Sequence, residues 1–225
     1  MKALAKEGSV RAMVLTGEGR AFSAGGDLNW LMERSRSSPF DNEKTMVDFY
    51  SRFVVQLRTL PVPTVAAIHG PAIGAGACVS LGCDVRVASD DSKLGFTFVG
   101  LNLHPGMGCT HYLPSIAGPE AASRLLLTGE VVSGAEAHRL GVVSEVAQGP
   151  EACLAAALAR AKAAAAQGPA AVQTLVTTLR QRQDVGLAAA LQREAAAQAL
   201  CYATKDYVEG LEAVAAKRKP NFTGV

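Results

Sequence analysis

The stretch that most constrains this chain is a glycine-rich turn between two apolar runs. The turn, His69-Gly70-Pro71-Ala72-Ile73-Gly74-Ala75-Gly76, follows the apolar run Thr64–Ile68 and leads into the run Val79–Leu81. Because glycine permits backbone conformations and close approaches that other residues resist, the pattern predicts a strand, a tight turn and the start of a helix. Ala75 then falls at or near the helix N-terminus, where backbone N–H groups lack partners within the helix and favour an oxyanion.

A second turn of the same kind precedes the first. Val10–Thr16 is predicted as a strand, and the small-residue loop Gly17–Leu28 leads into another predicted helix. One such turn is as often structural as functional. Two turns, however, can aim two N–H donors at one oxygen, polarise a carbonyl and stabilise an enolate or a tetrahedral oxyanion. Each donor is worth about 3 kcal/mol.

The two turns carry a family resemblance. The segments Arg20–Leu28 and Pro63–Ala77 together resemble the two signature loops of the enoyl-CoA hydratase/isomerase (crotonase) superfamily. The resemblance continues through Leu103–Gly108, Leu127–Glu130, Ala137–Val143 and Lys217–Phe222, and so covers nearly the whole chain. It implies an α/β fold, a crotonase-like spiral of ββα units with a C-terminal helical region.

The resemblance also implies a site. In that superfamily the two loops form an oxyanion hole for the thioester carbonyl of an acyl-CoA, and the matching N–H groups here belong to Gly26 and Ala75. The residues implied to contact the substrate or its coenzyme A portion are Ala21, Phe22, Ala24, Gly25, Asp27, Leu28, Gly74, Phe98 and Phe222. Among them, Asp27 is expected to order the first loop and not to act as a base. Coenzyme A enters as part of the substrate, so no tightly bound cofactor is expected.

The positions of the usual catalytic acids are the main departure from the superfamily. Its hydratases use two glutamates to move protons, and the matching positions here hold Cys78 and Phe98. Because each such group contributes about 10² to 10⁴-fold, we expect at most a slow hydratase. The substitute proton-transfer candidates are Cys78, near a predicted helix N-terminus that would favour a thiolate, and His104, since an unperturbed imidazole has a pKa of about 6.5. Each also has a simpler structural interpretation, as a small buried residue and as a loop histidine bonded to backbone.

Three functions follow from these observations. The first is an acyl-CoA-processing enzyme of the hydratase/isomerase type, a lyase or isomerase of fatty-acid or related acyl-CoA metabolism, with a thioester enolate in its oxyanion hole. The alternative is an acyl-CoA-binding member with little or no hydratase activity, because both usual glutamates are replaced. An adaptor that uses the last, helical third as an interaction surface would leave the two loops unexplained.

Composition excludes several other classes. The chain has 225 residues and a net charge of only +2, and its one basic cluster is Lys217–Lys219, so no nucleic-acid partner is expected. Five cysteines without a Cys-x-x-Cys pair indicate reduced thiols in a reducing compartment, the cytoplasm or the mitochondrial matrix. No apolar run has the length of a membrane span, and the four histidines lack ligand spacing, so neither a membrane nor a metal is expected.

The predicted elements divide the chain into two parts. Residues 1–149 are expected to form the ββα spiral core, which is predicted to start at the end of a helix, Met1–Gly8, without the opening strands of the superfamily. Residues 150–225 form a helical C-terminal region used in oligomerisation, as a homotrimer or a dimer of trimers. Its predicted helices are Pro150–Gln167, Pro169–Arg182, Leu187–Ala203 and Asp206–Lys217, and its small faces comprise Ala155, Ala156, Ala157, Ala159, Ala163 and Ala164.

Within the core, helical spacing of apolar residues predicts one long helix over Asn42–Leu60, after a polar loop at Arg34–Pro39. Its apolar stripe comprises Met46, Phe49, Tyr50, Phe53, Val54 and Leu57. Further predicted strands are Asp84–Ala88, Lys93–Phe96 and Val142–Val143, and further helices are Gly106–Ile116 and Pro119–Leu126. Ser133 with Glu136 forms a capping box, and Asp206 with Glu209 is predicted as a second cap.

Overall fold

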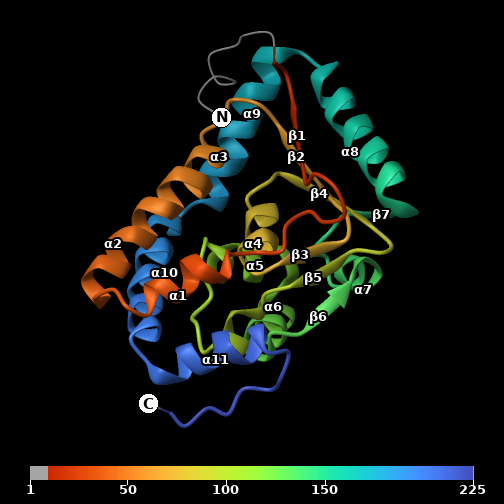
Figure 1. Ribbon diagram of the computed structural model, residues 1–225. Helices are drawn as coiled ribbons and strands as arrows, with labels where there is room; N and C mark the ends of the chain where they lie inside the picture. Colours follow the sequence, from red (N-terminus) through yellow and green to blue (C-terminus); the bar gives the residue numbers. More distant parts are fainter. Residues whose placement is uncertain (1–9, 225) are drawn as a thin grey trace.

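The computed structural model describes residues 10–224, so the helix end predicted for Met1–Gly8 lies outside the described residues. Two sheets form the centre of the molecule (Figure 1). The larger is all parallel, in the order β1 (Met13–Thr16), β2 (Thr64–Ile68), β4 (Val85–Ser89) and β7 (Glu145–Ala147). In the smaller, β3 (Pro71–Ile73) pairs in parallel with β5 (Lys93–Gly95), which pairs antiparallel with β6 (Val131–Ser133).

The chain alternates between the two sheets in a repeated unit. β2 passes into β3 of the other sheet and then into helix α4 (Ala75–Leu81), and β4 passes into β5 and then into the 3₁₀ helix η3 (Thr97–Leu101). β1 starts a similar unit, because Ser23 forms a parallel bridge with Ala72 before helix α1 (Leu28–Arg34). The expected spiral of ββα units is therefore confirmed.

Alternate residues of β2 face two different cores. Ala66 and Ile68 belong to the main hydrophobic core, whereas Val65 and Ala67 pack against helix α8 (Gly149–Ala165). This alternation follows from the two-residue period of a strand. On α8 the facing residues are Cys153, Ala157 and Ala161, one helical turn apart, and their small side chains let the helix lie close to the sheet.

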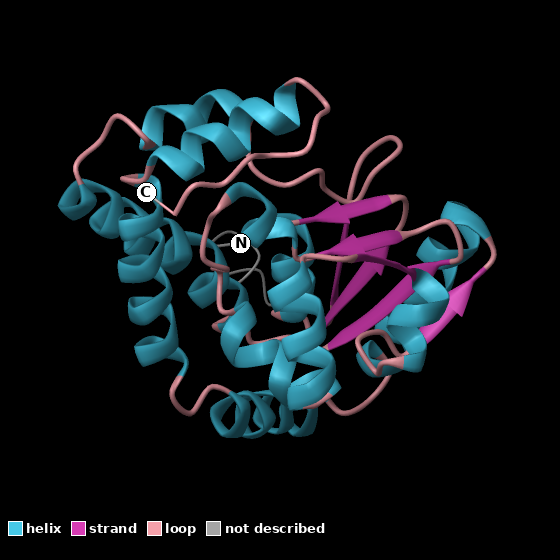
Figure 2. Cartoon of the chain, turned by 90° about the horizontal axis from the view of Figure 1, so that it is seen from below, coloured by secondary structure: helices cyan, strands magenta, loops and turns pink. Residues whose placement is uncertain are grey.

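Most of the remaining helices lie to one side of the strands. Figure 2 shows the strands gathered toward one side of the molecule and the larger group of helices on the other. Helix α10 packs along α2, as Figure 1 also shows. The bounds are α2 (Pro39–Tyr50), a π-helical turn (Ser51–Val55), α3 (Gln56–Arg58), α5 (Cys109–Ala117), α6 (Pro119–Thr128), α7 (Gly134–Arg139), α9 (Pro169–Gln183), α10 (Leu187–Tyr202) and α11 (Lys205–Ala215).

Several predicted boundaries are wrong. The helix expected from Asn42 starts earlier, because the Ser38 hydroxyl accepts from the Asp41 N–H and caps α2. The expected strand Val142–Val143 is a turn, since both of its N–H groups donate to the Ala137 carbonyl oxygen. The short strands β3, β6 and β7 were not predicted, because three residues carry little periodicity.

Two predicted helix starts also differ. Helix α5 begins at Cys109 and not at Gly106, because Met107 and Gly108 have φ angles of 61° and 78°, outside the helical range. Helix α11 is capped by the Thr204 hydroxyl, whereas the Asp206 carboxylate accepts instead from the N–H groups of Thr223 and Gly224. The Ser133 cap is confirmed, since its hydroxyl accepts from the Glu136 N–H.

One buried ion cluster joins the C-terminal helices to the sheet. Arg180 of α9 is 4% exposed, and its guanidinium donates to both carboxylate oxygens of Asp84 and to the carbonyl oxygens of Arg58, Leu60 and Val62. Burial raises the pKa of Asp84, but the hydrogen bonds and charge of Arg180 outweigh it and the pKa is lowered. The division at residue 149 and the use of residues 150–225 in oligomerisation stay predictions.

Candidate functional site

Backbone hydrogen bonds hold the two glycine-rich loops side by side. The Phe22 N–H donates to the His69 carbonyl (2.8 Å), the Ser23 N–H to the Pro71 carbonyl (3.0 Å) and the Ile73 N–H to the Ser23 carbonyl (2.9 Å). The first loop therefore lies along β3 as a short additional strand. This pairing brings the Gly25–Gly26 segment beside the start of α4.

The close approach depends on glycine at two positions. Gly25 has a φ of +97°, and a Cβ built on it would lie 2.8 Å from the Ile73 carbonyl oxygen. A Cβ on Gly76 would lie 2.5 Å from the Cβ of Ser23. Side chains at either position would force the loops apart.

Gly26 and Ala75 present the two N–H groups expected to act as donors. Ala75 is the first residue of α4, so its N–H has no partner within the helix. Within residues 10–224, neither the Gly26 N–H nor the Ala75 N–H donates to another protein group. Both residues line the same cavity. Two N–H groups without a protein acceptor therefore belong to residues of one cavity wall.

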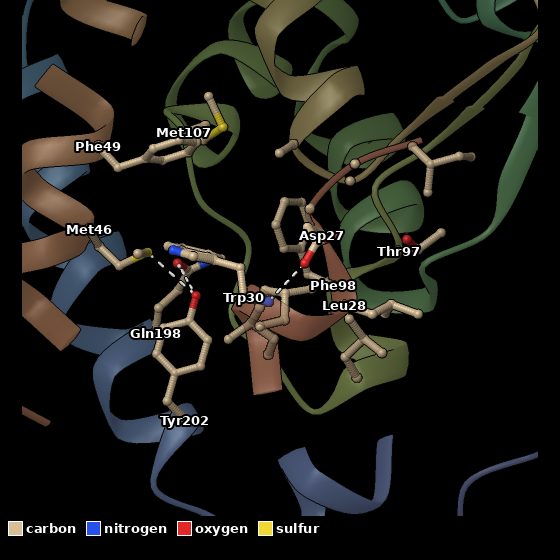
Figure 3. Close-up of a pocket in the computed structure, with 18 of the residues that line it drawn as sticks. Asp27, Leu28, Trp30, Met46, Phe49, Thr97, Phe98, Met107, Gln198 and Tyr202 are labelled. Carbon is tan, nitrogen blue, oxygen red and sulfur yellow. Dashed lines mark hydrogen bonds between the residues drawn. The ribbon is translucent and has the colours of Figure 1, made fainter. Parts of the chain in front are cut away.

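The cavity has a volume of about 1000 Å³ and a mainly apolar wall. Its large apolar residues come from α1, α2, β3, η3, the turn after η3 and α11, and Figure 3 shows several of them around the space. They are Leu28, Trp30, Leu31, Met46, Phe49, Ile73, Phe98, Leu101, Leu103, Met107 and Val214. A smaller cavity of about 290 Å³ adjoins it and shares Gly25, Phe49, Ala75 and Met107. Such a space suits an acyl group.

Most of the residues expected to contact substrate surround these cavities. Those on the larger cavity are Ala24, Gly25, Gly26, Asp27, Leu28, Gly74, Ala75 and Phe98. Phe22 lines the smaller cavity, whereas Ala21 and Phe222 line neither. The Asp27 carboxylate accepts from the Trp30 N–H (2.9 Å) and caps α1, which holds Gly26 at the entrance of that helix.

Neither of the two candidate proton-transfer residues lines a cavity. Cys78 is 1% exposed and lines neither cavity. Its thiol lies against that of Cys109, whose pKa is raised by burial and by that contact. His104 also lines neither cavity, and its Nδ1 lies 2.6 Å from the Pro105 carbonyl oxygen. Phe98, at the other glutamate position, does face the larger cavity.

Other polar residues of the cavity wall were missed by the sequence analysis. Asp48 comes from α2, Arg52 from the π-helical turn after α2, and Gln198 and Tyr202 from α10. Gln198 and Tyr202 are four residues apart and share one helix face, which the sequence could have indicated. Their meeting with Tyr50 depends on the packing of α10 along α2, which no sequence pattern indicated.

A buried carboxylate outside the cavity holds the turn that leads into α5. Glu194 is 1% exposed and accepts from the N–H groups of Gly108 (2.6 Å) and Thr110 (3.0 Å). Burial raises the pKa of Glu194, and the hydrogen bonds from Thr110 and Gly108 oppose that rise. This contact orders the turn that carries Met107, a residue of both cavities.

Comparisons with known proteins show what the chain resembles. A family model described as enoyl-CoA hydratase/isomerase matches residues 1–225. The chain is 35% identical to 2,3-dehydroadipyl-CoA hydratase of Escherichia coli (strain K12), over 100% of this chain and 85% of that protein. It is also 35% identical to the mitochondrial methylglutaconyl-CoA hydratase of Mus musculus, over 99% of this chain and 71% of that protein.

A solved structure gives the same comparison in three dimensions. The crystal structure of enoyl-CoA hydratase from Bacillus halodurans superposes with a TM-score of 0.86 at 26% sequence identity, covering 94% of this chain and 85% of that one.

Across residues 10–224, none of the helices is long and apolar enough to cross a membrane.

Proposed function

The chain belongs to the enoyl-CoA hydratase/isomerase family, and on that premise we propose that the backbone N–H groups of Gly26 and Ala75 bind the thioester carbonyl of an acyl-CoA. It is an acyl-CoA-processing enzyme of the hydratase/isomerase type. The observation that supports the proposed donors is that Gly26 and Ala75 line one mainly apolar cavity, and that within residues 10–224 neither N–H group has a protein acceptor.

The two donors would act on charge that develops during reaction. When a thioester becomes an enolate, its carbonyl oxygen gains negative charge, and a fixed N–H donor then gains strength without reorganising. Loss of one such donor typically lowers kcat by about 10² to 10³. The apolar wall strengthens this effect because it excludes water.

The reaction we propose is hydration or isomerisation of an enoyl-CoA through that enolate. Cys78 and His104 remain the proton-transfer candidates, although each would have to reach past the cavity wall. The alternative is an acyl-CoA-binding member with little or no hydratase activity. The replacement of both usual glutamates, by Cys78 and Phe98, supports this alternative.

We further propose that coenzyme A is bound only as part of the substrate, with no tightly bound cofactor. A homotrimer or a dimer of trimers is the assembly we propose, with residues 150–225 at the interface. The reducing compartment suggested by the cysteines would be the cytoplasm or the mitochondrial matrix.

The test uses crotonyl-CoA with the purified protein. Loss of the conjugated thioester absorbance measures turnover, and calorimetry on the same sample measures binding. Gly26→Pro removes one N–H donor and should abolish turnover; unchanged activity would show that the donor assignment is wrong. Turnover lost in Cys78→Ala or His104→Ala would identify the proton-transfer residue, and tight binding without turnover would favour the alternative.

A further inference from the structure

The cavity has a polar region that the proposed oxyanion hole does not use. Tyr50 of α2 and Gln198 and Tyr202 of α10 all line it, and they are only 1%, 3% and 2% exposed. Figure 3 shows Met46, Gln198 and Tyr202 together on one side of the cavity, across from Asp27 on the other. Buried polar side chains in an otherwise apolar wall require an explanation, because their burial is unfavourable unless they are hydrogen-bonded.

The hydrogen bonds define the orientation of each group. Gln198 Nε2 donates to the His104 carbonyl (2.7 Å), which places the amide oxygen toward the two phenols. That oxygen accepts from the Tyr50 hydroxyl at 2.8 Å and from the Tyr202 hydroxyl at 3.3 Å. Both acceptor positions of the amide oxygen are therefore used.

Tyr202 is the donor with the weakest partners. Its hydroxyl has two possible acceptors, the Gln198 amide oxygen at 3.3 Å and the Met46 sulfur at 3.4 Å. A well-formed O–H···O bond is about 2.7 to 2.8 Å long, and a thioether sulfur is a poor acceptor. Within residues 10–224, neither the Tyr50 nor the Tyr202 oxygen accepts a hydrogen bond from the protein. The pair therefore offers a donor and two acceptor oxygens to a ligand.

The turn after His104 leaves room for this cluster. A Cβ on Gly106 would lie 2.3 Å from the Tyr50 hydroxyl oxygen and 2.8 Å from Gln198 Nε2. Any other residue would displace the hydroxyl and the amide from their present positions. The cluster is thus held by α2, α10 and this turn together, and all three of its residues line the cavity.

We infer that Tyr50, Gln198 and Tyr202 form a specificity site for acyl groups that carry an uncharged oxygen, a hydroxyl or a keto group, away from the thioester. The inference rests on the proposed function, because the same cavity must first bind an acyl-CoA. The acyl oxygen accepts from the Tyr202 hydroxyl, and a hydroxyl on the acyl chain donates in turn to a phenol oxygen.

The charges on the wall favour an uncharged oxygen over a carboxylate. Among the described residues that line the cavity, the charged ones are Asp27, Asp48 and Arg52. A carboxylate on the acyl chain would therefore meet two like charges and one opposite charge. Burial raises the pKa of both Tyr50 and Tyr202, so the phenols stay protonated as neutral donors at physiological pH.

The experiment compares acyl chains of matched length on the full-length protein. Hexanoyl- and octanoyl-CoA are titrated by calorimetry beside their ω-hydroxy and ω-carboxy counterparts; these saturated chains cannot be hydrated during the measurement. We expect the ω-hydroxy chain to bind most tightly at the length that reaches the cluster. Its advantage should be about five- to tenfold, the size of one net hydrogen bond.

Variants of the cluster then test whether it is the source of the preference for the ω-hydroxy chain. Tyr202→Phe should remove the ω-hydroxy advantage, measured as the ratio of the affinities for the ω-hydroxy and the unsubstituted chain within that variant. Tyr207→Phe is the matched control, because Tyr207 is equally buried and lies edge-on against Tyr202, yet donates to the Leu31 carbonyl and does not line the cavity. If Tyr202→Phe fails to fold, Tyr50→Phe makes the same test on the other phenol.

Each other outcome overturns the inference. Equal binding of all three chain types, or tightest binding of the ω-carboxy chain, would refute it while leaving the proposed function intact. An ω-hydroxy preference that survives both Tyr202→Phe and Tyr50→Phe would place the recognition elsewhere. If no acyl-CoA binds at all, the proposed function fails together with the inference.

Discussion

Replacing Gly25 with alanine is the sharpest test of how the two loops form the site. The new Cβ would lie 2.8 Å from the Ile73 carbonyl oxygen, a separation that real Cβ atoms essentially never show. Gly19→Ala is the matched control. Gly19 belongs to the same loop and also has a positive φ (+76°), but a Cβ there meets nothing within 4 Å. Both variants place alanine at a positive φ, which costs each about 1 to 2 kcal/mol of stability, and Gly25→Ala adds the contact with Ile73.

The difference between the two variants is the contact with Ile73. To relieve it, the first loop must move several tenths of an ångström away from β3, and the Gly26 N–H moves with it. Sites of this kind tolerate displacements of about 0.5 Å. Complete loss of one donor lowers kcat by about 10² to 10³. Because Gly25→Ala displaces the donor without removing it, we expect kcat to fall by about 10- to 100-fold in Gly25→Ala and by less than about threefold in Gly19→Ala.

The assay should report on the carbonyl directly. Difference infrared spectroscopy of bound crotonyl-CoA, labelled with ¹³C at the carbonyl, measures how far the two donors lower the C=O stretching frequency. The shift should shrink in Gly25→Ala and persist in Gly19→Ala, whether or not the protein turns the ligand over. An equal shift in both variants and the wild type would show that Gly26 does not bind the carbonyl.

Three further predictions follow from other parts of the structure. Arg180→Met should lower the free energy of unfolding in urea by about 3 kcal/mol, because it removes the main partner of the Asp84 carboxylate, whose side chain is 24% exposed. Since the pKa of Asp84 is lowered in the folded protein, its stabilisation is complete above about pH 3.9 and is lost as pH falls through the folded pKa. The variant should therefore lose less stability than the wild type in that acid range, and an equal loss would contradict the ion pair. Phe98→Glu places a carboxylate on the cavity wall and should raise crotonyl-CoA hydration by about 10²-fold, and no gain would mean that this wall does not face the reacting carbon. In native protein, iodoacetamide should label Cys201 before the other four cysteines, which are buried. The labelling should be slow because burial raises the pKa of Cys201. Peptide mass spectrometry measures the order of labelling, and modification of another cysteine first would contradict the prediction.

The sequence alone determined the parts of this protein that depend on local patterns. The two glycine-rich turns, the helix start at Ala75 and the long C-terminal helices are all properties of short segments. Glycine spacing and helical periodicity report such features directly. The sequence also shows that Cys78 and Phe98 occupy the positions of the two usual glutamates, so the alternative of little or no hydratase activity could be raised without the structure.

Only the tertiary structure decided which side chains share a wall. Whether Cys78 faces the cavity or the core depends on the rotation of α4 against α5, and the structure places the thiol against Cys109. The cluster around Gln198 joins segments about 150 positions apart, with Tyr50 and Gln198 separated by 148 residues. Contacts at such distance arise from packing of whole elements, and a local sequence window contains no information about them.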